Sequence, residues 1–229
     1  MLNKAETWLE KTLDYKFNDK RLLEQSLTHR SAPGENNERL EFLGDAVLDF
    51  VISEVVFRMH PLAPEGDLSR LRASLVKDVT LAAVAADLGL GEHLILGSGE
   101  RKTGGHRRDS ILADALEAIF GAVYLDAGFD AASKLIERTF GARLQNFPDA
   151  DDLRDPKTRL QEWLQARQMG LPNYELVQVT GQAHRQVFEV SCSVNGMEIS
   201  TLGSGTTRRN AEQQAADSML AALTESANQ

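Results

Sequence analysis

Apolar residues recur at helical spacing through the first two thirds of the chain. Placed at about 100° per residue, five residues between 38 and 51 fall on one stripe that would face a core: Leu40, Leu43, Val47, Phe50 and Val51. Residues 110–125 are apolar nearly all round, which is typical of a buried helix. Further helices are expected over 67–76 and 80–88, because Gly and Pro interrupt the chain around them. This part of the chain is therefore predicted to be all-α.

The pattern changes to strands near the carboxyl end. Over residues 187–194, Phe188, Val190, Cys192 and Val194 alternate with Val187, Glu189, Ser191 and Ser193. This pattern is typical of a strand with one buried face. Strands are also expected over 173–180 and 197–202. The last of these follows Asn195-Gly196, a pair that favours a two-residue type I′ hairpin.

Helices are expected on both sides of these strands, over 157–168 and 208–223. The order α-β-β-β-α predicts a second, α+β domain over residues 155–226. The first, all-α domain is expected to span 1–146. Residues 147–154 are acidic, lack periodicity and belong to a stretch bracketed by Pro148 and Pro156, so they are interpreted as a linker.

Composition limits the compartment and the partners. The net charge is −9, and neither part is basic: residues 155–229 carry six Lys and Arg against eight Asp and Glu. Any nucleic-acid contact must then come from local clusters and bound cations. The single cysteine, Cys192, excludes an internal disulfide and a cysteine-based metal cage. Without a visible signal peptide or an apolar run of about 18 residues, the chain is expected to be cytoplasmic and not membrane-bound.

Carboxylates gather on one side of the first acidic helix. Glu38, Glu41, Asp45 and Asp49 share about one quadrant of the helical wheel, opposite the apolar stripe. Stacked carboxylates repel one another, so a positive group should lie beside them. The alternative interpretation is a solvated acidic face.

A second carboxylate pair favours a metal site. Asp114 and Glu117 are the only charges in the apolar helix 110–125, and their spacing places them side by side. Ionised carboxylates in a buried helix need a cation, and no base lies within four residues of either one in that helix. If the two helices pack together, Glu41, Asp45, Asp114 and Glu117 form an all-oxygen site. Such a site suits Mg²⁺, with Mn²⁺ as a substitute, and does not suit zinc.

These residues match the motifs of a known family. Residues 38–48, Glu-Arg-Leu-Glu-Phe-Leu-Gly-Asp-Ala-Val-Leu, resemble the defining motif of ribonuclease III, the double-stranded-RNA endonuclease of bacteria. Residues 113–118, Ala-Asp-Ala-Leu-Glu-Ala, resemble its second acidic motif. The resemblance implies that Asp45 and Glu117 are the residues most directly tied to catalysis. It also implies supporting contacts, to RNA or near the metal, from Glu38 and Glu65.

Residues 155–226 resemble the double-stranded-RNA-binding domain. The match rests on residues 156–162, 181–188 and 203–212. Three patches would contact the minor grooves and the phosphates between them: Gln161, Gln165, Gln182, His184, Arg185, Arg208 and Arg209. Taken singly, Arg208 and Arg209 could be a solvated helix start. His184 could equally stabilise its hairpin.

Phe42 lies away from the apolar stripe, beside the carboxylates. A large aromatic in that position suggests a partner surface, although local packing is an alternative. The family resemblance implies a homodimer in which this aromatic docks into the other subunit. Two sites related by two-fold symmetry would then cut both strands.

The function predicted from these residues is Mg²⁺-dependent hydrolysis of double-stranded RNA. The resemblance implies 5′-phosphate and 3′-hydroxyl ends with a short 3′ overhang, and substrates among ribosomal RNA precursors, messenger RNAs and transfer RNAs. One alternative is a double-stranded-RNA-binding protein without catalysis, which would not need the four acids. A phosphohydrolase of small nucleotides would leave residues 157–226 unexplained.

Overall fold

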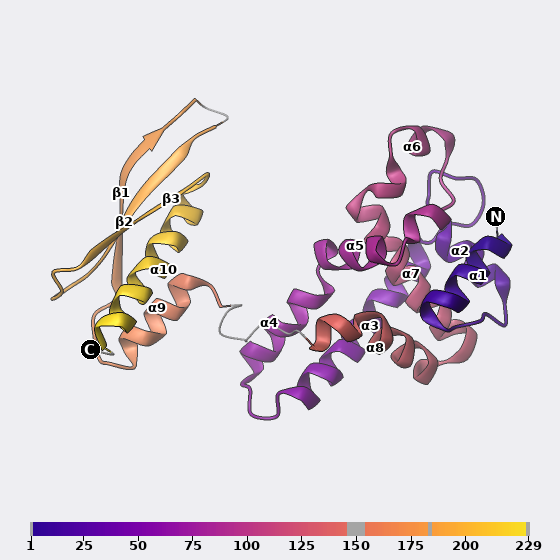
Figure 1. The fold of residues 1–229 in the computed structure, drawn as a ribbon, viewed down its shortest axis with the longest axis horizontal. Helices are drawn as coiled ribbons and strands as arrows, with labels where there is room; N and C mark the ends of the chain where they lie inside the picture. Colours follow the sequence, from indigo (N-terminus) through magenta and orange to yellow (C-terminus); the bar gives the residue numbers. More distant parts are fainter. Residues whose placement is uncertain (1, 146–153, 183–184, 228–229) are drawn as a thin grey trace. The chain divides into compact units, whose positions relative to one another are not determined.

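The structure, a computed structural model, describes residues 2–145, 154–182 and 185–227. The chain forms two compact units, Met1–Ala150 and Asp151–Gln229 (Figure 1). The predicted linker, 147–154, lies almost wholly outside the described residues.

The first unit is helical, as expected from the sequence. Its helices are α1 (Leu2–Leu13), α2 (Lys20–Leu27), α3 (Glu38–Met59), α4 (Glu65–Val76), α5 (Asp78–Asp87), η1 (Leu90–His93), α6 (Ser98–Lys102), η2 (Gly105–Arg107), α7 (Asp109–Ala127) and α8 (Phe129–Gln145). Among the described residues, the extended pairing in this unit is limited to an isolated parallel bridge between Thr28 and Ile95.

Helix α7 forms the centre of this unit. Its residues from Ile111 to Val123 are buried except for Asp114 and Glu117, and α2, α3, α5 and α8 pack around it. Burial of so many large apolar side chains supplies the main driving force for this packing, at about 1.5–3 kcal/mol for each such chain. The prediction of a buried helix is therefore confirmed.

Two glycines let α3 and α7 approach until their backbones touch. A Cβ atom added at Gly44 would collide with the carbonyl oxygen of Glu117 and lie 2.9 Å from the backbone nitrogen of Gly121. A Cβ at Gly121 would collide with the carbonyl oxygen of Leu40. This contact places the residues on either side of Gly44 directly against one turn of α7.

The prediction that Phe50 belongs to the core stripe is wrong. Its side chain is 61% exposed, whereas Val51 and Ile52 beside it are fully buried. The core face of α3 is centred on Leu48, Val51 and Val55, and at about 100° per residue Phe50 points away from it. Its ring instead meets Phe129 edge to face, with centroids 5.3 Å apart.

The second unit has the predicted order α-β-β-β-α. Its elements are α9 (Pro156–Gln165), β1 (Pro172–Thr180), β2 (Val187–Val194), β3 (Ser200–Gly205) and α10 (Arg208–Ala227). The strands form an antiparallel sheet in the order β1-β2-β3, and both helices cover one face of it (Figure 1). Cys192 is buried with Leu160, Leu164 and Met219, as its position in the alternating strand predicts.

The expected type I′ hairpin does not form between β2 and β3. Val194 and Met197 close a turn by a 3.1 Å backbone hydrogen bond, but only Gly196 in it has positive φ, at 86°. A type I′ turn needs positive φ at both central residues. The strands pair from Ser193 opposite Ser200, so a longer connection joins them and β3 begins three residues later than expected.

Within the described residues, no helix is long and apolar enough to cross a membrane.

Candidate metal centre and nucleic-acid interface

Helices α3 and α7 bring three of the predicted acids together. Glu41, Asp114 and Glu117 each offer a carboxylate oxygen, and these oxygens lie within 4.8 Å of one another. All three side chains are half-buried. The acids come from segments more than 70 residues apart, and the glycine contact between the helices positions them. We refer to these three residues as the acid cluster.

The acid cluster is electrostatically unfavourable without a cation. Burial raises the pKa of Glu117 to about 8, with further contributions from the charges of Asp45, Glu41, Asp114 and Asp78. Burial also raises the pKa of Glu41 and of Asp114, and neighbouring carboxylates add to both effects. Like charges held close in a partly dry site disfavour the ionised forms.

Asp45 lies beside the acid cluster and is not a member of it. It is exposed on α3, one turn after Glu41, and partial desolvation together with the charge of Asp49 raises its pKa. Among the charged neighbours of Glu117, Asp45 has the largest effect on its pKa. The four acids predicted as one ligand set therefore form a group of three with a fourth, more solvated carboxylate next to it.

The donor set fits a hard divalent cation. Among the residues that the structure describes, no lysine or arginine forms an ion pair with Glu41, Asp45, Asp114 or Glu117. The oxygens of the acid cluster are close enough to share one ion. An all-carboxylate set is the chemistry that Mg²⁺ and Mn²⁺ prefer.

Glu41 and Asp114 lie on the wall of an open cleft of about 810 Å³. The cleft also contains two arginines, each bound to a glutamate outside the acid cluster. Arg30 Nη1 lies 3.6 Å from Glu38 Oε1, and Arg108 Nη1 lies 2.9 Å from Glu100 Oε1. The cleft is thus lined by carboxylates and by two arginines whose side chains are more than half exposed.

The two supporting acids predicted from sequence lie in different places. Glu38 lines the cleft, and its charge contributes to the raised pKa of Glu41. Glu65 begins α4, accepts a 2.7 Å hydrogen bond from Ser69, and lines a separate hollow with Phe57 and Arg72. The structure therefore brings Glu38 to the site and places Glu65 elsewhere on this chain.

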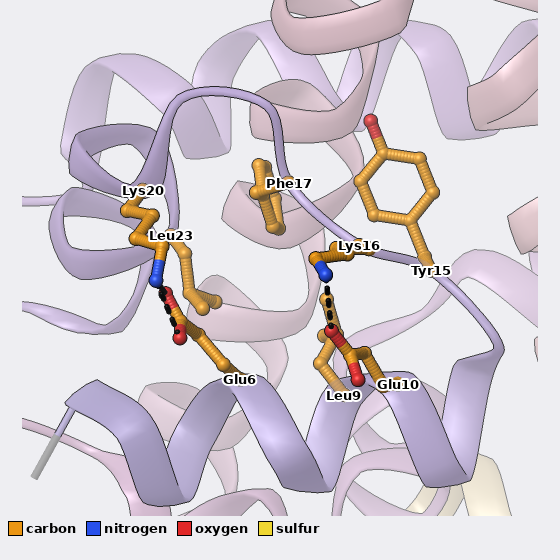
Figure 2. Close-up of a pocket in the computed structure, with 8 residues that line it drawn as sticks. All are labelled: Glu6, Leu9, Glu10, Tyr15, Lys16, Phe17, Lys20 and Leu23. Carbon is orange, nitrogen blue, oxygen red and sulfur yellow. Dashed lines mark hydrogen bonds and ion pairs between the residues drawn. The ribbon is translucent and has the colours of Figure 1, made fainter.

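A separate hollow of the first unit shows carboxylates whose charge is neutralised by lysines. It encloses about 20 Å³ between α1 and the segment that leads into α2. In Figure 2, Lys20 reaches Glu6 and Lys16 reaches Glu10, at 2.8 and 3.8 Å. Its carboxylates already have lysine partners, so this hollow lacks the uncompensated charge of the acid cluster.

Asp78, His29 and Arg30 contribute to the site but were not expected from sequence. Asp78 is the first residue of α5, and its charge raises the pKa of both Asp114 and Glu117. His29 and Arg30 lie in the segment before α3 and line the cleft. None of the three belongs to a periodic pattern, so only their type and their place before or between helices could have drawn attention to them.

The predicted RNA-contacting residues of the second unit are exposed. Gln161 and Gln165 lie on α9, and Gln182 and Arg185 lie between β1 and β2. His184 is outside the described residues. Arg208 and Arg209 stand at the start of α10 and approach Glu212 and Asp155, at 2.9 and 3.9 Å.

Comparisons with known proteins agree with this architecture. A family described as Ribonuclease-III-like matches residues 19–144, and the Double-stranded RNA binding motif matches residues 156–223. Ribonuclease 3 of Hahella chejuensis is 55% identical over 215 residues, which cover 94% of this chain and 95% of that protein. Ribonuclease 3 of Nitrosococcus oceani is 54% identical over 213 residues, covering 92% of this chain and 91% of that protein.

A solved structure agrees with the fold of the first unit. The nuclease domain of Ribonuclease III from Campylobacter jejuni has a TM-score of 0.56 and 49% identity, and covers 58% of this chain and 97% of that one. A helical unit with an acid cluster, followed by an RNA-binding unit, defines a hydrolase that acts on RNA. The chain belongs to the ribonuclease III family, the endoribonucleases of double-stranded RNA.

Proposed function

We propose that this chain is a Mg²⁺-dependent endoribonuclease in which Glu41, Asp114 and Glu117 hold the metal ion and Asp45 acts beside it. The observation that carries the proposal is the convergence of three uncompensated carboxylates from two helices. Mn²⁺ is expected to substitute for Mg²⁺, because it prefers the same oxygen donors.

The residues of the chain divide the work of hydrolysis. The bound ion supplies positive charge and lowers the pKa of coordinated water. Glu117 must release its proton to bind, since burial and its neighbours hold its pKa at about 8. Asp45, the exposed neighbour, is placed to orient the attacking water and to accept its proton. The half-buried acids fix the geometry, so little reorganisation is needed when RNA arrives.

The products and substrates follow from this assignment. In-line attack of water on phosphorus, with the 3′ oxygen as leaving group, yields a 5′-phosphate and a 3′-hydroxyl. Two such sites offset across a duplex leave a short 3′ overhang. We propose ribosomal RNA precursors, together with some messenger and transfer RNAs, as the natural substrates.

The second unit supplies RNA affinity. We assign contacts to Gln161 and Gln165, to the β1–β2 turn with Gln182, His184 and Arg185, and to Arg208 and Arg209. Rigid modules of this type span about 16 base pairs by touching two minor grooves and the phosphates between them. The proposed boundaries are 1–146 for the catalytic domain, 147–154 for the linker and 155–226 for the RNA-binding domain.

We propose a homodimer built on the exposed face of α3. Phe42 is 80% exposed, and Phe50 and Phe57 follow it on the same side of the helix at 61% and 70%. Three exposed phenylalanines on one side of a helix are typical of an interaction site. The nuclease domain of Campylobacter jejuni is described as having a region involved in dimer formation, which supports a second copy as the partner. A cytoplasmic location stays a prediction.

Cleavage of duplex RNA with and without metal tests the function. The protein is incubated with long double-stranded RNA in Mg²⁺ or in EDTA, beside a Glu117→Gln variant. We expect cleavage only by the unaltered protein with Mg²⁺, and unchanged RNA binding by the variant. Intact RNA in every reaction would instead indicate a protein that binds duplex RNA without cutting it. Loss of binding in the variant would show that Glu117 has a different role.

A further inference from the structure

Arg30 is a cation at the rim of an acidic cleft. Arg30 lines the cleft together with Glu41 and Asp114, and its side chain is 71% exposed. Its charge favours the ionised forms of both acids and partly offsets the rise in their pKa. A positive charge in this position also opposes the binding of a divalent cation. If the site bound only a metal ion, the charge of Arg30 would therefore weaken that binding.

The backbone that carries Arg30 is fixed on both sides. The Thr28–Ile95 bridge precedes it, with His29 N donating to the carbonyl of Ile95 at 3.0 Å. Ser31 follows it and accepts a 3.0 Å hydrogen bond from the backbone N–H of Gly97. A Cβ at Gly97 would collide with the carbonyl oxygen of Ser31, so the two segments are in direct contact. The side chain of Arg30 thus projects from a rigid base.

The guanidinium of Arg30 forms an ion pair with Glu38. The two groups lie 3.6 Å apart, and both are more than half exposed at 71% and 53%. Glu38 itself accepts a 3.0 Å hydrogen bond from the side-chain amide of Asn36, whose own oxygen accepts from the backbone N–H of Glu38. An exposed ion pair of this kind contributes little to stability. Its effect is to orient Arg30 over the cleft.

We propose that Arg30 binds a non-bridging oxygen of the RNA phosphate that enters the cleft, and that Glu38 is the residue that positions it. The proposal rests on the metal-dependent hydrolysis proposed above. A planar guanidinium can donate two parallel hydrogen bonds to a phosphate. These hydrogen bonds become stronger as negative charge develops on the phosphate oxygens. Arg30 exchanges its weak pairing with Glu38 for this anion. Arg30 would thereby neutralise the part of the negative charge on the phosphate that the metal ion does not neutralise.

The proposal predicts effects of opposite sign on metal and on catalysis. For Arg30→Ala, we expect Mn²⁺ binding to the RNA-free protein, measured by titration calorimetry, to tighten roughly twofold or more, because a repelling charge is gone. At saturating Mg²⁺, we expect kcat on a duplex of about 30 base pairs to fall at least about tenfold. Arg30→Lys should recover part of the rate, since it keeps the charge and loses the planar fork.

Arg21→Ala is the matched control, because Arg21 pairs with Asp19 away from the cleft and is 89% exposed. It should change neither quantity. Glu38→Gln should lower kcat when Arg30 is present and add little in the Arg30→Ala background. A merely structural role for Arg30 would weaken metal binding and cleavage together, and that result overturns the proposal. Unchanged kcat in Arg30→Ala overturns it too, while leaving the nuclease assignment in place because the unaltered protein still cleaves.

Discussion

Glu117 binds its proton more tightly in the folded chain than it would in water. Burial is the main cause, and the charges of Asp45, Glu41, Asp114 and Asp78 add to it. The same environment makes the site receptive to a divalent cation, because one ion relieves both the desolvation and the mutual repulsion of the carboxylates. At the scale of single residues, a metal ion bound at the acid cluster, as we propose, would compete there with protons.

The raised pKa of Glu117 predicts that the stability of the metal-free protein depends on pH. The pKa of Glu117 rises from 4.5 to about 8 on folding. Its contribution to stability is therefore fully present below about pH 4.5 and is lost as the pH rises toward 8. Urea unfolding in EDTA at pH 5 and pH 8 should show a larger loss of stability for the unaltered protein than for Glu117→Gln. Identical losses in the two proteins would contradict the raised pKa.

Sequence reasoning found the acids but not their surroundings. Glu41, Asp45, Asp114 and Glu117 were identifiable because unpaired carboxylates in apolar helices are costly. Arg30 and Asp78 were not, because each reaches the site from a segment whose position depends on tertiary contacts. The Thr28–Ile95 bridge that fixes the segment before α3 joins residues far apart in sequence.

At the scale of elements, the site depends on the contact between α3 and α7. Gly44 and Gly121 lie where the two backbones touch. Gly44 stands between Glu41 and Asp45 on α3, and Gly121 follows Glu117 by one turn on α7. Without side chains at these positions the helices come close enough for one ion to reach both. The sequence contains both glycines, but only the crossing of the helices shows why no side chain fits there.

Gly44→Ala should separate the helices. The added Cβ would collide with the carbonyl oxygen of Glu117, so we expect a loss of at least about 2 kcal/mol in stability and a strong loss of Mg²⁺-dependent cleavage. Gly141→Ala is the control, because its Cβ would meet nothing within 4 Å on helix α8. That variant should gain roughly 0.5–1 kcal/mol from helix propensity. Chemical denaturation measures both, and equal stability of the two variants would refute the close contact.

Element boundaries were predictable to within a few residues, and the failures have specific causes. Periodicity predicts a core position for Phe50 because α3 carries two apolar faces, and the pattern alone does not distinguish the core face from the exposed one. Asn195-Gly196 forms a turn, but β3 pairs with β2 only from Ser200 onward. Turn residues therefore located the reversal of the chain and did not set the register.

At the scale of the whole molecule, the two-unit organisation followed from the change in hydrophobic period after residue 155. Net charge was a poor guide, since the chain carries −9 and still belongs to a family that acts on RNA. The contacts to phosphate that we propose therefore rest on local groups such as Arg208 and Arg209. The homodimer that we propose depends on one surface, the exposed face of α3.

Phe42→Asp should weaken the proposed dimer. A charge placed on a side chain that is 80% exposed costs the single chain little, but it would be buried without a partner at the interface. We expect the dissociation constant to rise at least about tenfold in sedimentation velocity over a range of concentrations. Leu171→Asp, on a side chain that is 59% exposed in the second unit, is the control and should leave it unchanged. An unaltered dimer in Phe42→Asp would remove Phe42 from the interface.

The direct test of the central claim is to locate the metal. Crystals of the unaltered protein grown with Mn²⁺ should show one anomalous scattering peak within bonding distance of carboxylate oxygens from Glu41, Asp114 and Glu117. Crystals of Glu117→Gln should show a weaker peak or none. A peak at other residues, or a side-chain cation lying among the three acids in place of manganese, would contradict the assignment.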